Sequence, residues 1–311
     1  MVCNAPTDRS AVLELLGPEF ALMLAGLALR RGLAWPEQGW VMLEKLNYFL
    51  LFPCLLFLSI VKAPGSIASA ASMMLAAGTS AACAIAMGMA CRWIPQTQPQ
   101  RFASSVQTAF RFNSYLGLAM AERLGGAEGL ALFSIMISVL IPCFNVAAVY
   151  PMARQGKQNL WRELAGNPLI IATLGGLAWR SLEMPLPGLI QASLGRLGQA
   201  ALPLGLLCVG AALRWPRSEQ GLLVGDRWLA LCFTTIKLIA MPAIALLVCD
   251  ALGLGGTAGL LVVMFCALPT SPASYVLASR MGGDGVYVAQ LITLSLLVST
   301  LTLPFWIQFA R

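Results

Sequence analysis

Long apolar runs separated by short polar stretches make up most of this chain. Ten of the runs approach the length of about 20 residues that a helix needs to cross the hydrocarbon core of a bilayer. We number them as spans one to ten, with expected limits at residues 11–30, 39–61, 67–91, 102–122, 128–151, 164–182, 189–213, 228–250, 257–279 and 286–309. The pattern therefore predicts an all-α membrane protein with ten transmembrane helices.

Span nine contains a polar interruption in an otherwise apolar run. Pro269 and Pro272 flank Thr270 and Ser271 there, and proline neither donates a backbone hydrogen bond nor fits easily inside a helix. A break in hydrocarbon leaves backbone groups unpaired at a high free-energy cost, so it survives where it lines a cavity. We therefore expect two half-helices that meet at Thr270 and Ser271.

A second interruption, in span four, matches the first. A shift of 157 positions places Arg123 on Arg280 and Asn113-Ser114 on Thr270-Ser271. A single kink is more often only a bend, but a kink that recurs in both halves of a membrane chain points to a transporter binding site. This match indicates that spans four and nine are equivalent broken helices.

Other prolines extend the match between the two halves. Pro53 in span two corresponds to Pro203 in span seven, and a similar pair links spans five and ten. We therefore divide the chain into two five-helix repeats, residues 1–155 and 156–311, within one integral membrane unit. Because five is an odd number of spans, the repeats are expected to be inverted relative to each other.

The positive charges set the expected orientation. Eleven Lys and Arg residues lie in the loops after the odd-numbered spans, against six on the opposite side, and cytoplasmic loops carry the excess. Arg9 is the only positive charge ahead of the first run, so we expect a retained span and no cleaved signal peptide. The prediction is a multi-pass protein of the inner (cell) membrane with both termini outside.

Composition excludes several classes of function. Hydrophobic residues make up 59% of the 311 and charged residues 11%, and there is no His. The usual general bases and metal ligands are therefore scarce, which argues against an enzyme and against a metal or other cofactor. The nine cysteines stand singly, without a C-x-x-C pair, and no basic cluster would bind nucleic acid.

Six short segments give the chain a resemblance to the auxin efflux carrier family, which includes plant PIN-type carriers and bacterial carriers described as malate or malonate transporters. The segments are Asn47–Pro53, Phe112–Gly117, Asn167–Ile170, Pro203 with Gly210–Leu213, Lys237–Pro242 and Ala267–Thr270. The resemblance implies ten spans in two inverted repeats, a fold related to that of bile acid/sodium symporters, with broken spans four and nine crossing at the substrate site. One departure is the lack of a proline near Gly117, which predicts a softer break in span four.

Polar residues at the two breaks are the first candidates for substrate contact. Asn113 and Ser114 open a half-helix, whose free N–H groups and positive dipole end suit a carboxylate. The alternative is that Asn113 only caps that half-helix. Thr270, Ser271 and Ser274 have the matching place in span nine, where they could instead only satisfy the broken backbone.

Three further polar side chains are weaker candidates. Asn145 lies in span five, which the resemblance places beside the crossing, but an amide there could also join two helices. Ser59 in span two and Tyr115 in span four are candidates of the same kind, since a lone Ser or Tyr in a span is usually a helix contact.

Two positively charged side chains are the last candidates for the substrate site. Lys237 lies about ten residues into span eight, where an ammonium must snorkel, pair or face water. It could attract an anion, or form a salt bridge to an acid such as Glu122 or Asp250. Arg111, just before the first break, could line the path of an anion or hold a half-helix in place.

Together these features predict a secondary carrier of a small organic anion, a mono- or dicarboxylate of the auxin-like, malate or malonate class. An elevator-like or rocking movement would displace the crossing bundle against spans one, two, six and seven. The alternative is a membrane receptor or channel-like scaffold that binds at the same site without transport. The resemblance in fold to bile acid/sodium symporters implies that a sodium site would include an acidic residue beside the crossing. Span nine has no Asp or Glu, which disfavours sodium coupling without excluding it, and a homodimer in the bilayer is left open.

Overall fold

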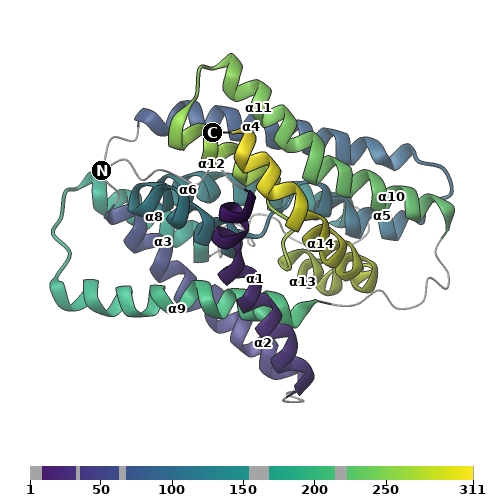
Figure 1. Cartoon of the computed structure of the whole chain (residues 1–311). Coiled ribbons are helices and arrows are strands. Elements are labelled where there is room, and N and C mark those ends of the chain that lie inside the picture. Colours follow the sequence, from purple (N-terminus) through teal and green to yellow (C-terminus); the bar gives the residue numbers. More distant parts are fainter. Residues whose placement is uncertain (1–8, 33–35, 63–67, 154–167, 214–222, 311) are drawn as a thin grey trace.

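The computed structural model describes residues 9–32, 36–62, 68–153, 168–213 and 223–310, and within these ranges every regular element is a helix (Figure 1). The start of predicted span six, the boundary between the two predicted repeats and Asn167 lie outside the described residues. The α-helices are α1 (Arg9–Gly32), α2 (Glu37–Leu46), α3 (Phe52–Val61), α4 (Ala68–Ala90), α5 (Pro99–Ser105), α6 (Ser114–Ala153), α8 (Pro168–Ser181), α9 (Gly188–Ala212), α10 (Val224–Thr235), α11 (Met241–Ala251), α12 (Gly256–Ala267), α13 (Ala273–Arg280) and α14 (Gly285–Phe309). Short 3₁₀ or π-helical pieces continue some of them, namely η1 (Asn47–Leu51), η2 (Cys91–Trp93), η3 (Val106–Ala109) and η4 (Ile236–Ala240).

Six helical stretches of the described chain are long and apolar enough to cross a membrane. They are Gln38–Val61, Ala71–Trp93, Pro99–Met152, Gly188–Ala212, Val224–Ala251 and Gly285–Phe309. These six stretches contain seven of the ten predicted spans, because the third includes both span four and span five. The other three predicted spans are helical in their described parts but shorter or more polar: α1, α8, and the pair α12 and α13. The structure thus confirms a multi-pass helical protein.

A bend divides the longest helix, α6. Gly126 has φ 59° and ψ −149°, which is not helical, and glycine adopts a positive φ without the steric cost that other residues incur. The bend lies between the predicted end of span four and the predicted start of span five. The residues before it complete span four, and the residues after it form span five.

Two prolines explain the π-helical pieces. Pro242 follows η4 by two residues and has no N–H to donate to the carbonyl four residues earlier, on Leu238. Trp306 Nε1 of α14 donates to that oxygen at 2.8 Å. Pro53 follows η1 in the same way, so each proline widens the turn before it without ending the span.

The helices pack as two groups (Figure 1). In the first group, α9 packs against α1 and α3, and α3 packs against α8. Glycines allow the α1 and α9 backbones to touch, since a Cβ at Gly26 or Gly210 would overlap a carbonyl of the other helix. The second group holds α4, α5 and α10 to α14, and α6 connects the two groups through contacts with α3, α8 and α9.

A polar cluster joins three connections at one end of the second group. Arg101 Nη1 lies 2.6 Å from Asp226 Oδ2, and Arg101 Nε lies 2.9 Å from Asp284 Oδ2. The buried Asp226 carboxylate also accepts hydrogen bonds from the backbone N–H groups of Gln98 and Leu223. The connections after predicted spans three, seven and nine therefore lie together, as spans that alternate in direction require.

Candidate substrate site at two crossed broken helices

The predicted break in span nine is present. Helix α12 ends at Ala267, and α13 begins at Ala273. Leu268 has extended geometry, with φ −59° and ψ 145°, which is the conformation that a following proline favours. Pro269 therefore ends α12, and the chain passes through Pro272 before the next half-helix starts.

The break in span four is as complete as that in span nine, so the expectation of a softer break is wrong. The chain tightens into the 3₁₀ turn η3 and leaves helical geometry at Phe110, and α6 begins only at Ser114. The Asn113 side chain takes the place of a proline, because its Oδ1 accepts the Leu116 N–H at 3.2 Å. This is an N-cap, which lets a helix start without proline.

The two breaks cross and satisfy one another's backbone groups. The Asn113 N–H donates to the Pro269 carbonyl at 2.8 Å, and Thr270 Oγ1 donates to the Thr108 carbonyl at 2.8 Å. The Thr270 N–H donates to Ser295 Oγ of α14 at 3.0 Å. Asn113 and Thr270 are buried, so both alternatives raised for them from the sequence, capping and backbone satisfaction, occur in the structure.

Ser274 is a candidate whose hydroxyl has no hydrogen-bond partner in the part of the chain that the structure describes. Its Oγ is fully buried and makes no hydrogen bond within the described residues, while its carbonyl accepts from Gln107 Nε2 at 3.2 Å. Ser271 Oγ accepts the Ala273 N–H at 3.3 Å, at the start of the same half-helix. A buried hydroxyl without a partner is costly, so Ser274 is the strongest candidate for a direct bond to a ligand.

Lys237 lies at the C-terminal end of half-helix α12. Its ammonium is fully buried and lies 2.9 Å from the Cys266 carbonyl and 3.4 Å from Met241 Sδ. The Cys266 oxygen is the one that Thr270 N–H would reach in an unbroken helix, so Lys237 caps a carbonyl freed by the break. Neither Glu122 nor Asp250 pairs with it in the part of the chain that the structure describes, so the proposed salt bridge is wrong.

Arg111 lies in the unwound segment of span four and reaches span five. Its Nη1 donates to Gln107 Oε1 at 3.0 Å, and its Nη2 donates to Asn145 Oδ1 at 3.2 Å. The structure thus brings Asn145 to the crossing, as expected. Since both partners are neutral amides and no carboxylate pairs with Arg111 among the described residues, this part of the site has an excess of positive charge.

Buried aromatic rings surround the crossing. Phe110, Phe112, Phe133, Phe144 and Phe265 form ring contacts with centroids 4.6 to 6.4 Å apart. Such an apolar shell lowers the local dielectric constant and strengthens electrostatic attraction to the nearby cations.

The packing around this shell also explains a glycine. A Cβ at Gly117 would come within 2.5 Å of Phe133 Cζ and 2.7 Å of a Leu268 side-chain carbon. Gly117 is therefore needed for the close approach of α6 to the break in span nine.

Two predicted residues lie away from the crossing. Ser59 Oγ donates to the Leu55 carbonyl of its own helix at 2.7 Å, which is an ordinary helix contact. The Tyr115 ring packs on Phe52, with centroids 4.9 Å apart, and fills the space above Gly205. Tyr115 therefore packs α6 against α3 and α9 of the first helix group.

Sequence reasoning missed two polar residues of span two. Asn47 is buried, and its Nδ2 donates to the Ala201 carbonyl at 3.0 Å, while its Oδ1 has no partner within the described residues. Glu44 is a half-buried acid in the same span. The signal that could have found Glu44 is general, since an ionisable residue inside a span is a functional candidate by default.

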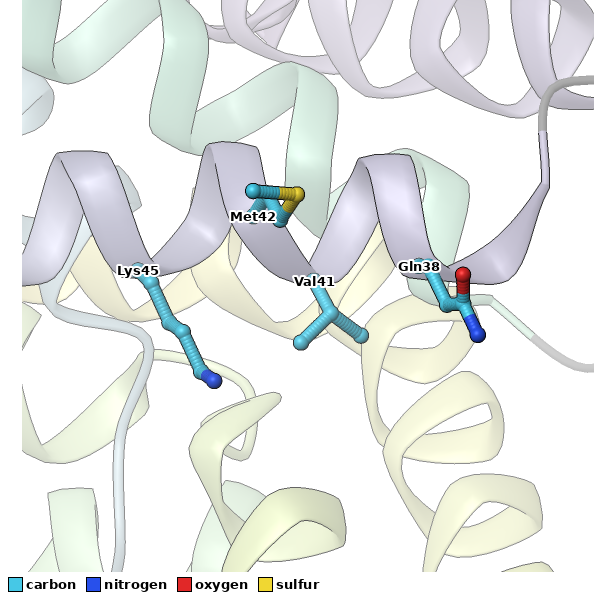
Figure 2. A pocket seen from close by; sticks show the side chains of 4 residues that line it. All are labelled: Gln38, Val41, Met42 and Lys45. Atoms are coloured by element: carbon cyan, nitrogen blue, oxygen red, sulfur yellow. The ribbon is translucent and has the colours of Figure 1, made fainter.

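A shallow hollow lies on α2, the helix that contains Glu44, on the face away from the buried residues of that helix. Figure 2 shows it lined by Gln38, Val41, Met42 and Lys45, all from α2. Val41 and Met42 are 44% and 70% exposed, so the hollow opens on the outside of the helix group. It shares no residue with the crossing and is not part of the candidate site.

A multi-pass membrane protein with a crossed pair of broken helices has the architecture of a secondary transporter. Residues 149–307, about half of the chain, match the family model described as "Membrane transport protein". The chain therefore belongs to this membrane transport protein family, the auxin efflux carrier family, and is a transporter and not an enzyme. The match includes the break in span nine but not the one in span four.

A plant protein gives a second, more distant similarity. The chain is 25% identical over 144 residues to "Auxin efflux carrier component 5" of Arabidopsis thaliana. The aligned region covers 45% of this chain and 40% of the plant protein. The chain thus matches less than half of that relative's length.

Proposed function

We propose that the protein is a secondary carrier of a small organic anion that binds at the crossing of spans four and nine. The main support is the charge of the site: Lys237 and Arg111 lie beside the breaks, and no carboxylate pairs with either among the described residues. The half-helices α6 and α13 also begin at the crossing, and helix N-termini favour anions.

A mono- or dicarboxylate of the auxin-like, malate or malonate class fits these groups. Its carboxylate would accept hydrogen bonds from the N-terminal turns of α6 or α13 and from the free Ser274 hydroxyl. The apolar shell of phenylalanines would exclude water around it. The name of the plant relative, an auxin efflux carrier component, is in keeping with cargo of this kind.

The movement that we propose is an elevator-like or rocking displacement of the crossing bundle, within two inverted repeats at residues 1–155 and 156–311. Its support is the division of contacts: α1, α3, α8 and α9 pack mainly on one another, and α6 carries most of the contacts between the groups. Tyr115 on Gly205 would be one point at which the two groups slide.

Transport by the purified protein is the test of this proposal. In proteoliposomes preloaded with unlabelled malonate, we expect saturable uptake of labelled malonate by counterflow. A receptor or scaffold, the alternative function, would bind the anion without any counterflow. A malate-loaded sample tests the other dicarboxylate of the class, and protein-free liposomes are the control.

The proposed orientation has its own test. We expect reporters placed before Ala11 and after Arg311 to report the outside of the cell, because Lys and Arg are in excess on the opposite side. A reporter inserted near Gln158, which lies outside the described residues, is expected to report the cytoplasm. A cytoplasmic C-terminus with an outside N-terminus would imply an odd number of spans and refute the ten-span arrangement.

A further inference from the structure

Glu44 is an acid within span two that the crossing site does not use. It belongs to a stripe on α2 and η1 that points into the protein: Trp40, Asn47 and Leu51, which lie four residues before it and three and seven residues after it, are all buried. These spacings place all four on one face of a helix. The opposite face holds the open hollow with Lys45 (Figure 2).

The Glu44 carboxylate has no ionic partner within the described residues. Helix α9 covers this stripe, because Trp40 packs with Cys208 and Ala211 and Asn47 Nδ2 donates to the Ala201 carbonyl. The Cys208 thiol of α9 and the Tyr115 hydroxyl of α6 are neutral at physiological pH. Within the described residues no hydrogen bond reaches the Glu44 carboxylate either. Arg30 of α1 donates to the Ala211 carbonyl near the C-terminal end of α9 and keeps its positive charge there. Tyr48 lies about one turn further along the span of Glu44.

An unpaired charge inside a span is costly, and protonation removes that cost. Protonation also turns the carboxylate into a hydrogen-bond donor. Asn47, one turn further along the same stripe, has a buried Oδ1 that makes no hydrogen bond within the described residues. Protonation would therefore stabilise the Glu44 carboxyl group in its half-buried place, one turn away from a hydrogen-bond acceptor that lacks a donor within the described residues.

We propose that Glu44 is the proton-binding residue that couples transport of the anion to protons. The proposal rests on the function proposed above and adds the coupling ion to it. A proton from one side of the membrane adds to the Glu44 carboxylate to give the neutral acid, and the same proton leaves on the other side, with no redox change. Because a charged Glu44 near the start of α6 would repel an anion, the proton and the anion move together.

The test compares the parent with Glu44→Gln in proteoliposomes, with labelled malonate as the probe. For the parent we expect an acidic exterior to drive malonate accumulation and to acidify the lumen, as read by a trapped pH-sensitive dye. Glu44→Gln should lose both responses and keep malonate counterflow at equal pH, because exchange needs no net proton movement. Glu122→Gln, an exposed acid of α6, is the matched control and should behave like the parent.

The outcomes separate the two proposals. Absence of counterflow in the parent would refute the carrier function itself, and the coupling with it. Counterflow in the parent with equal pH-driven accumulation in Glu44→Gln would refute only the role of Glu44. If Glu44→Gln loses counterflow too, Glu44→Asp decides: a shifted pH profile of accumulation supports the proposal, and an unchanged profile refutes it.

Discussion

Replacement of Lys237 by methionine is expected to raise the Kd for malonate by roughly 10- to 100-fold, the loss that corresponds to about 1.5–3 kcal/mol for a hydrogen bond to a charged group. Methionine is an unbranched side chain that lacks the charge. In the structure the ammonium caps the Cys266 carbonyl at the end of α12 and has no carboxylate beside it within the described residues. Its charge is therefore available to a bound anion.

Two roles of Lys237, attraction of the anion and stabilisation of the fold, can be separated by comparing a charged ligand with a neutral one. Thermal shift or calorimetry on purified protein would compare malonate with malonamide, which has the same carbon chain without charge. Arg111→Gln, at the other end of the site, is expected to act in the same direction. Equal losses for both ligands, together with a lower yield of folded protein, would instead assign Lys237 to capping of α12 alone.

The breaks could be predicted from the sequence because their causes are local. Pro269 and Pro272 limit the backbone wherever they occur, and a polar pair in an apolar run is visible without a structure. Asn145 was also found, since a lone amide in a span needs a partner. What the sequence could not give is which groups satisfy the breaks, because those bonds join Asn113 to Pro269 and Thr270 to Thr108 across the whole chain.

The two expectations that the structure contradicts both concern side chains that pair with backbone groups at the breaks. The softer break expected in span four rested on the missing proline, and it gave too little weight to the cap by Asn113 that the sequence also suggested and that the structure contains. The salt bridge proposed for Lys237 assumed that a buried ammonium needs an acid, whereas a carbonyl freed by the break serves as its acceptor. Glu44 was overlooked although an ionisable residue inside a span is a candidate by default. That it shares a helix face with buried residues became known only from the burial of α2 and η1.

The second large effect is expected from Pro269→Ala. Alanine at this position supplies the N–H that the Phe265 carbonyl would accept in a continuous helix, and it relieves the restriction on Leu268. Helix α12 should then extend through the break and pull the backbone at 269 and 270 away from span four. The bonds to the Asn113 N–H and the Thr108 carbonyl would be lost, at about 0.5–1.5 kcal/mol each.

We therefore expect Pro269→Ala to abolish malonate counterflow and to change hydrogen exchange in residues 106–117 and 265–274 together. Asn113→Ala should act differently, because the Asn113 bond to Pro269 comes from the backbone and survives the substitution. It removes only the cap on Leu116, worth about 0.5–2 kcal/mol, so malonate binding should weaken while expression and the exchange pattern at 265–274 stay unchanged.

Pro272→Ala is the matched control for these variants. Pro272 directly precedes α13, at a helix start where a missing N–H costs little, so its replacement should leave both the break and counterflow nearly intact. If Pro269→Ala and Asn113→Ala bind and exchange malonate as well as the parent does, the crossing is not the substrate site. The anion would then have to bind elsewhere, and the cations beside the breaks would serve only to satisfy the half-helices.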